Sequence, residues 1–233
     1  MNFVVTNFSG NVGKSTISKH LLGPRLPNSE ITLVESINAN DSDDEAIRGK
    51  DYGTLVNSLV EKTHYVIDVG ASNVEDFIAR MKQYKGSHEE FDLFLIPTVP
   101  THKQQADTVS TINALSKLGV PGDKIRVVFN RIEPEVNLQK DFALLFDLHS
   151  LRPNSFVLYP LVSIQENELY GLLEGRSIAD ILEDTTDFNA KIKQSNDKFE
   201  KLEWSKKKGV KRLASGVNEE LDVVFALLFP EGV

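Results

Sequence analysis

The segment "FVVTNFSGNVGKST", residues 3–16, joins a short apolar run to the Gly-Lys-Ser ending of a phosphate-binding loop. Residues 3–6 are apolar or β-branched, as expected for a buried parallel strand. Residues 10–16 follow as a loop and the start of a helix, which we expect to end near Gly23 and Pro24. A strand, a phosphate-binding loop and a helix in this order predict an α/β nucleotide-binding fold.

This loop lacks the first glycine of the general pattern G-x-x-x-x-G-K-[ST], and Ser9, Gly10 and Asn11 occupy that region. It still predicts a phosphate cradle, because successive backbone N–H groups can surround a phosphate and the following helix adds its dipole. Asn11 is well suited to replace glycine at a positive φ angle. The nucleotide-binding residues predicted in the loop are Gly10, Asn11, Val12, Gly13, Lys14, Ser15 and Thr16.

Three side chains carry the expected phosphate and metal chemistry. Lys14 is expected to bridge the β- and γ-phosphates, and the Ser15 hydroxyl to bind Mg²⁺. Asp68 ends an apolar strand, where its carboxylate can hold a Mg²⁺-bound water. An alternative role for Asp68 is to cap the next helix, although Ser72 can supply that cap.

The strand pattern predicts a P-loop NTPase three-layer sandwich, with a mostly parallel central sheet and helices on both faces. Right-handed crossovers place the carboxyl ends of all strands at one edge, where ligands bind. The loop, Asp68 and Asn130 should therefore meet there. Further strands are expected at residues 31–35, 65–70, 91–97, 125–130 and 155–160.

The C-terminal third is expected to be helical. The pattern is helical from residue 163 to the end, with a predicted break at 204–209. We predict a single P-loop ATPase domain over residues 1–233, in which 185–233 is a C-terminal helical region. The apolar run at 221–229 is too short to cross a bilayer, and we expect it to pack on the sheet or on a partner.

Composition limits the function classes. The 233 residues carry a net charge of −8, which argues against binding nucleic acid by bulk electrostatics. The absence of cysteine excludes disulfides and thiol chemistry. No signal peptide or transmembrane run is evident, so we expect a cytoplasmic protein, with association to the nucleoid or a membrane as further options.

One dense basic cluster could contact the DNA backbone despite the net charge. The alternative is an ordinary solvated turn of helix. The cluster consists of Lys206, Lys207, Lys208, Lys211 and Arg212.

The phosphate-binding loop resembles the deviant Walker A motif of the ParA/MinD class, K-G-G-x-G-[KS]-[ST]. Two positions depart from it, since Asn11 replaces a glycine and Ser9 replaces the signature lysine. In that class the lysine reaches the nucleotide across a dimer interface. The matching residues are Gly10, Val12, Gly13, Lys14 and Ser15.

With "VES" at 34–36 and "DVGAS" at 68–72, the loop resembles in particular the small ParA-like ATPases of conjugative plasmids, the StbB/TraL type. The resemblance implies binding of ATP and Mg²⁺, slow hydrolysis and a nucleotide-dependent homodimer. It also implies a plasmid-encoded DNA-binding or transfer protein as partner, and a role in plasmid stability, positioning or conjugative transfer.

The catalytic acid is less well matched. The class carries D-x-D where this chain has Glu35 and Ile37, with Asn38 or Asp41 as possible substitutes. Glu35 is therefore the candidate for activating water, or else only the polar end of a strand. This departure predicts hydrolysis that is slow or depends on a partner.

The adenine site is also inferred from the resemblance. In related ATPases an asparagine at the position of Asn130 reads the adenine amino group, which suits an amide that both donates and accepts. Arg131 and the loop at Pro160 and Leu161 are expected near the base. A simple turn residue is the alternative for Asn130.

Two other functions remain open. A small-molecule ligase or kinase of the dethiobiotin-synthetase type has this fold and a similar loop, and would need a second substrate pocket. A non-hydrolysing ATP-binding scaffold is favoured by Ser9 and Ile37, which depart from the class.

Overall fold

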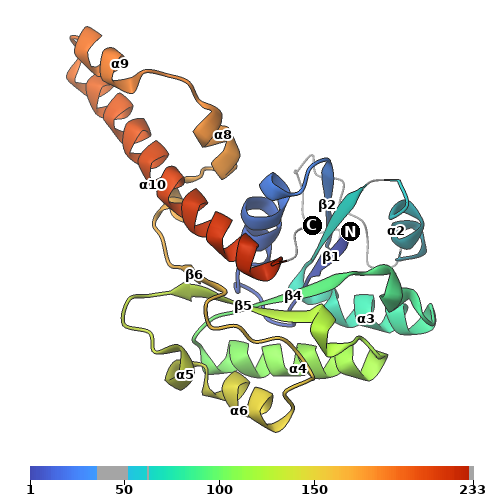
Figure 1. The fold of residues 1–233 in the computed structure, drawn as a ribbon. Coiled ribbons are helices and arrows are strands. Elements are labelled where there is room, and N and C mark those ends of the chain that lie inside the picture. Colours follow the sequence, from blue (N-terminus) through green and yellow to red (C-terminus); the bar gives the residue numbers. More distant parts are fainter. Residues whose placement is uncertain (36–51, 62, 231–233) are drawn as a thin grey trace.

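A parallel sheet forms the centre of the computed structural model, which describes residues 1–35, 52–61 and 63–230. Among these residues its six strands lie in the order β2-β3-β1-β4-β5-β6 (Figure 1). Every neighbouring pair is parallel, so the carboxyl ends of the strands share one edge. The strands are β1 (Asn2–Val5), β2 (Ser29–Val34), β3 (His64–Val69), β4 (Leu93–Thr98), β5 (Ile125–Ile132) and β6 (Ser163–Gln165).

Both faces of the sheet are buried, as the continuous apolar runs of its strands predict. In β1, Phe3 and Val5 lie in one core cluster and Val4 lies in the other, because successive side chains of a strand point to opposite faces. All three side chains are completely buried. A parallel sheet with two covered faces confirms the predicted α/β sandwich.

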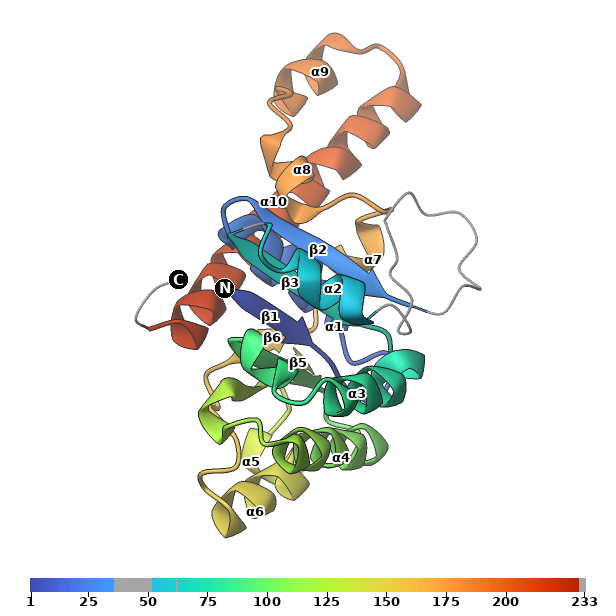
Figure 2. The same ribbon diagram turned by 90° about the vertical axis from the view of Figure 1, so that its right-hand side faces the viewer.

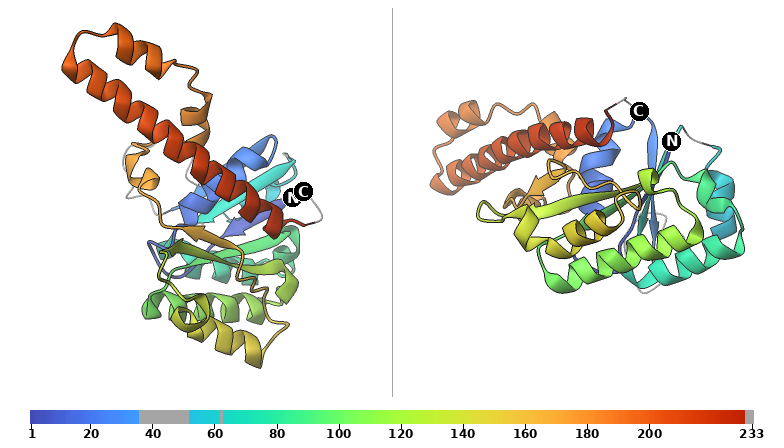
Figure 3. Two further views of the ribbon diagram at one scale, coloured as in Figure 1. Left: turned by 60° about the vertical axis from the view of Figure 1, so that its left-hand side comes forward. Right: turned by 60° about the horizontal axis from the view of Figure 1, so that its bottom comes forward.

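Helices form the two outer layers, which lie on opposite sides of the sheet in Figures 2 and 3. The layer that packs with Val4 contains α2 (Tyr52–Ser58), α3 (Val74–Gln83), α4 (His102–Leu118), α5 (Leu138–Asp141) and α6 (Ala143–Leu151). The layer that packs with Phe3 contains η1 (Ile17–Leu22), α7 (Leu169–Leu172), α8 (Ile178–Glu183) and α10 (Lys198–Leu228). The short 3₁₀ turns are η2 (Gly23–Arg25), η4 (Ala71–Asn73), η5 (Ser87–Glu90) and η6 (Gly122–Lys124).

The helix after the phosphate-binding loop ends close to Gly23, as predicted, because η1 ends at Leu22 with Gly23 as its C-cap. Helix α1 (Lys14–Thr16) continues into η1, which is π-helical, and then into η2. Gly23 keeps a right-handed helical conformation with φ −47°. Pro24 lies in the first turn of η2, where proline is tolerated because that N–H has no intrahelical partner.

The sixth strand was predicted in the wrong place. Residues 155–160 form only an isolated bridge, between Val157 and Arg126, and β6 begins at Ser163. Pro160 lies between these two pairings and has no N–H to donate. Pairing with β5 resumes where the Phe129 N–H donates to the Val162 carbonyl.

The cap predicted at Ser72 is also wrong. Residues 71–73 form η4, and α3 begins at Val74 with Asn73 as its N-cap. The Ser72 hydroxyl is therefore one residue too early to cap α3, and no side chain caps this helix.

Helix α10 runs without a break from Lys198 to Leu228, so the interruption predicted at 204–209 is wrong. Gly209 weakens helix propensity, but packing along α10 from α7, α8 and α9 (Phe188–Gln194) outweighs one residue's preference. The C-terminal half packs on the sheet layer as predicted, with Leu221 and Val224 buried.

The other half of α10 and α9 form a helical hairpin that extends beyond the sheet layers (Figures 1 and 3). We call residues 188–212 the hairpin. Within the described ranges, no helix is both long enough and apolar enough to cross a membrane.

Candidate nucleotide-binding site

The phosphate-binding loop connects β1 to α1 at the carboxyl edge of the sheet. Asn11 has φ 57° and Gly13 has φ 91°, both in the left-handed region. The prediction that Asn11 takes the backbone conformation of a glycine is confirmed. Gly10 and Asn11 are exposed, whereas Val12 is buried and anchors the loop in the protein.

Asn130, in strand β5, holds the loop in place. Its amide Nδ2 donates to the Val12 carbonyl at 2.9 Å, and the side chain is 3% exposed. A Cβ atom on Gly13 would lie 1.9 Å from that nitrogen. Gly13 is therefore required twice, for its positive φ and for the close approach of Asn130.

Lys14 is buried beneath the loop. Its Nζ donates to the carbonyl oxygens of Ser9, at 2.8 Å, and Asn7, at 3.3 Å. Burial lowers the pKa of the Lys14 ammonium, and the charge of Asp68 opposes that shift. The cation thus sits in a dry position between the loop and the end of β3.

Asp68 and Ser15 come together as predicted for a magnesium site. The pairing of β1 with β3 places Asp68 opposite Val5, the last residue of β1 before the loop. The side chain is 2% exposed; burial raises the pKa of Asp68, while the Ser15 hydrogen bond and the Lys14 charge oppose this.

The second carboxylate oxygen of Asp68, Oδ2, is buried and has no hydrogen-bond partner among the described residues. A buried carboxylate oxygen without a donor, beside a serine hydroxyl, fits a hard cation such as Mg²⁺. In the part of the chain with described coordinates, no group of three or more histidine or acidic side chains could hold a metal by itself. A cation here would take further ligands from phosphate and water.

A buried polar network supports the loop, and the sequence analysis did not predict it. Asn7 is completely buried; its Nδ2 donates to the Pro97 carbonyl and to the Thr108 hydroxyl, each at 2.8 Å. Its Oδ1 accepts from the Ser9 N–H at 2.8 Å. The Phe8 N–H donates to the Thr111 hydroxyl at 3.1 Å, so helix α4 holds both ends of this turn.

One sequence signal could have revealed this network. Thr108 and Thr111 lie at helical spacing with Ile112 and Leu115, on the buried face of α4. Polar residues on a buried helix face need hydrogen-bond partners, and the nearby end of β1 offers them.

Glu35 lies close to the site. A Cβ atom built on Gly70 would be 3.5 Å from Glu35 Cγ, and the Glu35 charge contributes to the raised pKa of Asp68. Ile37, at the position of the class's second aspartate, and its predicted substitutes, Asn38 and Asp41, lie outside the described residues.

The two other residues predicted to contact adenine, Arg131 and Pro160, make no hydrogen bond or ion pair with the loop in the described part of the chain. Arg131 has φ 54° and is exposed, with Nε 3.9 Å from a carboxylate oxygen of Glu166. Pro160 is exposed in the irregular stretch before β6, which runs beside β5 rather than past its end. Of the predicted adenine residues, Asn130 is the one that is hydrogen-bonded to the loop in the described part of the chain.

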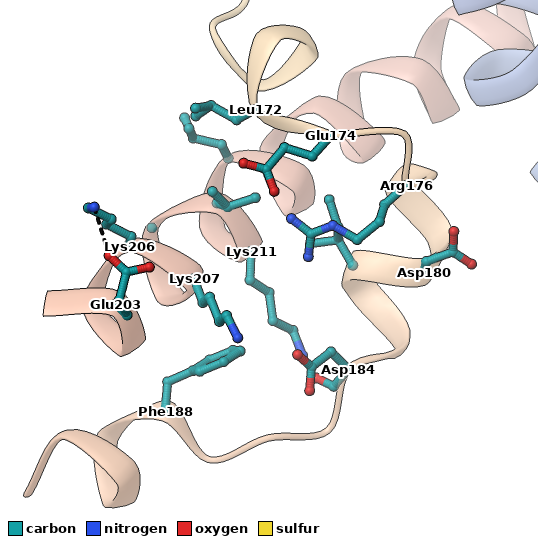
Figure 4. A pocket seen from close by; sticks show the side chains of 14 residues that line it. Leu172, Glu174, Arg176, Asp180, Asp184, Phe188, Glu203, Lys206, Lys207 and Lys211 are labelled. Carbon is teal, nitrogen blue, oxygen red and sulfur yellow. Dashed lines mark hydrogen bonds and ion pairs between the residues drawn. The ribbon is translucent and has the colours of Figure 1, made fainter. Parts of the chain in front are cut away.

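The predicted basic cluster lies beside a cavity of about 450 Å³ between α8, α9 and α10 (Figure 4). Four acidic and four basic side chains line it, so the cavity does not concentrate either charge. Four lysines of the cluster contact the hairpin or the segment before it. The contacts are Lys206 with Glu203, Lys207 with Trp204, Lys208 with Asn189 and Lys211 with Asp184.

Comparisons with known proteins support the fold. No protein-family model matches the sequence, and no curated protein matches it significantly. The structure is similar to the cell division protein MinD of Aquifex aeolicus, with a TM-score of 0.56 and 13% identity over 100% of this chain and 98% of that chain.

Weaker similarities are to an ATP complex of McdA from Cyanothece and to the MinC:MinD complex of Aquifex aeolicus. For McdA the TM-score is 0.48, with 14% identity over 95% of this chain and 96% of that chain. For the MinC:MinD complex it is 0.49, with 16% identity over 77% and 88%.

The chain has an α/β P-loop fold with the overall arrangement of MinD. This confirms, at the level of the fold, the resemblance to the ParA/MinD class.

Proposed function

We propose that this chain is an ATP-binding switch ATPase of the ParA/MinD type that hydrolyses ATP slowly. The observation that carries the proposal is one constellation at the carboxyl edge of the sheet. In the loop, Asn11 and Gly13 have positive φ angles, and buried Lys14 and the Ser15 hydroxyl follow beside Asp68. One carboxylate oxygen of Asp68 is buried without a hydrogen-bond partner among the described residues. Phosphate and Mg²⁺ are the ligands that this donor set suits.

The loop would bind the phosphates of ATP through its backbone N–H groups. Lys14 would exchange its contacts with the carbonyls of Ser9 and Asn7 for phosphate oxygens. Because Lys14 is buried, its charge would be weakly screened and would stabilise negative charge that develops during hydrolysis.

Ser15 and Asp68 would hold Mg²⁺, which supplies charge neutralisation at the phosphates when bound. Glu35 is our candidate for orienting or activating water, because it lies at the end of β2 beside Gly70. With Glu35 and Ile37 in place of the two aspartates of the class, we expect slow hydrolysis or stimulation by a partner.

Asn130 would contribute to adenine selection as well as holding the loop. One of its two amide hydrogens donates to Val12, and its second hydrogen and its oxygen remain for the base. Arg131 and Pro160 would contact the base if the loops that carry them close over it.

We further propose that ATP favours a homodimer that acts through a plasmid-encoded DNA-binding or transfer protein in the cytoplasm. This part rests on the resemblance of the loop to the StbB/TraL type. Ser9 stands where the class carries its signature lysine, so the dimer would form without that contact.

Solution mass by light scattering tests the proposal directly. We would compare the nucleotide-free protein with samples in Mg²⁺-ATPγS and Mg²⁺-ADP, with Lys14→Ala as control, and measure nucleotide affinity by calorimetry. A doubling of mass with ATPγS alone, lost in Lys14→Ala, is the expected result. Unchanged mass with intact ATP binding would overturn the dimer switch, and no ATP binding would overturn the whole proposal.

A turnover assay separates the remaining alternatives. Slow phosphate release from ATP alone is expected for the switch. Binding without turnover under any partner condition would instead identify a scaffold, and turnover only with an added small molecule would identify a ligase or kinase.

A further inference from the structure

Asn7 is a buried polar side chain just after β1 to which the proposed chemistry gives no role. Its Nδ2 donates to the Pro97 carbonyl and to the Thr108 hydroxyl, and its Oδ1 accepts from the Ser9 N–H. The side chain is completely buried. Both amide hydrogens and the amide oxygen thus have partners inside the protein, which fixes the amide in one orientation.

The contact with Ser9 closes a turn in the backbone at residues 7–9. An asparagine side chain can bond the N–H two residues later in this way and so hold a turn by itself. The middle residue is held from helix α4, because the Phe8 N–H donates to the Thr111 hydroxyl at 3.1 Å. Asn7 and α4 together therefore set the direction of every peptide group in this turn.

Thr108 anchors Asn7 on a regular helix. Its hydroxyl can donate to the Gln104 carbonyl, one helical turn earlier, at 2.8 Å, which leaves its oxygen to accept from Asn7. The Thr98 hydroxyl of β4 lies 3.1 Å away, and both threonines are completely buried. A helix and a strand hold a side chain more precisely than a loop does.

The turn aims two backbone carbonyls at Lys14. The Nζ atom donates to the Ser9 carbonyl at 2.8 Å and to the Asn7 carbonyl at 3.3 Å. Lys14 is 8% exposed, so an ammonium that lost these acceptors would be buried with few substitutes. A buried charge without acceptors is costly, and the side chain would then leave its place beneath the loop.

We propose that Asn7 is a positioning residue for Lys14. Through the turn at 7–9 it fixes the two carbonyls that hold the ammonium beneath the loop, and Thr108 fixes Asn7. The consequence for ATP rests on the proposed function: phosphate oxygens would meet a cation that is already in place, which lowers the cost of binding. If Asn7 only filled space in the core, its loss would act independently of Lys14.

Thr108→Val is the central variant of the test. It keeps the branched shape of threonine and removes the hydroxyl that accepts from Asn7. Thr108→Ser keeps the hydroxyl and serves as the rescue variant. Asn7→Ala removes all three side-chain contacts and can prevent folding, so the milder substitution carries the test.

The first measurement is urea unfolding of the full chain without nucleotide. Thr108→Val should lower the urea midpoint in the wild-type background. In a Lys14→Met background the shift should be no more than about half as large, because methionine has no ammonium that needs the two carbonyls. This cycle does not depend on ATP binding.

The second measurement is the affinity for Mg²⁺-ATPγS by calorimetry. Thr108→Val should weaken binding about five-fold, the size expected for one hydrogen bond. Thr108→Ser should bind like the wild type. Circular dichroism would verify that each variant is folded at the temperature of the assay.

Two substitutions serve as matched controls. Ser110 lies on the exposed face of α4 and makes the same kind of bond to a carbonyl one turn earlier, that of Ala106, at 3.0 Å. Thr32 is a buried threonine of β2, a strand that does not adjoin β1. Neither Ser110→Ala nor Thr32→Val should change the affinity for ATPγS.

Three results would overturn the inference. One is an equal midpoint shift for Thr108→Val in the wild-type and Lys14→Met backgrounds, which would show that the anchor acts without Lys14. The others are an unchanged affinity for ATPγS in Thr108→Val, and a loss of affinity that Thr108→Ser shares. If the wild type binds no ATPγS, the proposed function fails, and the urea cycle alone decides the role of Asn7.

Discussion

Single residues at the carboxyl edge of the sheet fix the conformation of the phosphate-binding loop. The resemblance implies that Asn130 reads the base, and in the structure its amide fixes the loop through Val12. Gly13 gives that amide room and supplies the positive φ angle. The conformation of the loop therefore depends on two residues that are far apart in the sequence.

This coupling predicts a non-additive mutant cycle. Gly13→Ala should lower the free energy of unfolding by about 1–3 kcal/mol because of its left-handed φ, and the clash with Asn130 adds to that cost. Asn130→Ala leaves the Val12 carbonyl without its donor and should cost about 1–3 kcal/mol. The double variant should lose less than the sum, because removing Asn130 removes the clash.

Urea unfolding measures each variant of this cycle. Gly10→Ala is the matched control, since no atom lies within 4 Å of its added Cβ and its φ is not positive, and it should change stability by less than about 0.5 kcal/mol. Strict additivity, or an equal cost for Gly10→Ala, would contradict the packing described for Gly13.

Asp68 predicts a pH-dependent difference in stability. Its pKa is raised in the folded protein, so between the unfolded and folded pKa values the folded state binds more protons, and stability falls as pH rises. Asp68→Asn removes this titration. The free energy of unfolding should therefore shift in favour of the variant as pH increases from 4 to 7.

Urea unfolding of both proteins without nucleotide, at pH 4 and pH 7, would measure that shift. If the wild type instead gains stability relative to Asp68→Asn as the pH rises from 4 to 7, burial does not raise the pKa of Asp68. Ser72→Ala is a useful reference, since it lies nearby and adds no charge change.

At the scale of the element, α10 shows how packing overrides local preference. The sequence "WSKKKG" at 204–209 favours a break, because it ends in glycine and is highly polar. In the structure the flanking helices pack along it, and the helix continues for 31 residues.

Gly209→Ala should therefore stabilise the protein by about 0.5–1 kcal/mol, since alanine favours a helix interior and no atom lies within 4 Å of the added Cβ. Helical ellipticity and amide exchange of residues 198–212 would report the gain. Gly119→Ala is the opposite control, because Gly119 ends α4 at φ 96° and its replacement should cost about 1–2 kcal/mol. Loss of stability in Gly209→Ala would mean that the helix is broken there.

At the scale of the whole molecule, Arg25 links the phosphate-binding helix to α10. Its guanidinium donates to the carbonyls of His20 and Leu21, to Asn218, and to the Asp222 carboxylate, and its side chain is 9% exposed. The loop, η1 and η2 are thus joined to the helix that carries the hairpin.

Arg25→Ala should lower the free energy of unfolding by about 2–4 kcal/mol, because it leaves several partly buried acceptors without donors. Asp222→Ala removes only one partner, which is 58% exposed, and should cost no more than about 1 kcal/mol. Thermal or urea unfolding compares the two. Equal losses would show that the ion pair, rather than the backbone contacts, carries the link.

The sequence by itself determined the class of fold and the centre of the site. Continuous apolar runs predicted five of the six strands, because a strand buried on both faces has to be apolar throughout. The loop "SGNVGKS" predicted the positive φ of Asn11, and the strand-end aspartate predicted the meeting of Asp68 with Ser15, because these features depend on local chemistry and on parallel strand order.

Only the tertiary structure decided the features that depend on distant partners. The displaced sixth strand follows from where hydrogen bonding to β5 resumes after Pro160, and the unbroken α10 follows from helices packed along it. The network of Asn7 with Thr108 and the engagement of the basic cluster require knowing which side chains meet. Such contacts join residues far apart in the chain, and local pattern carries no record of them.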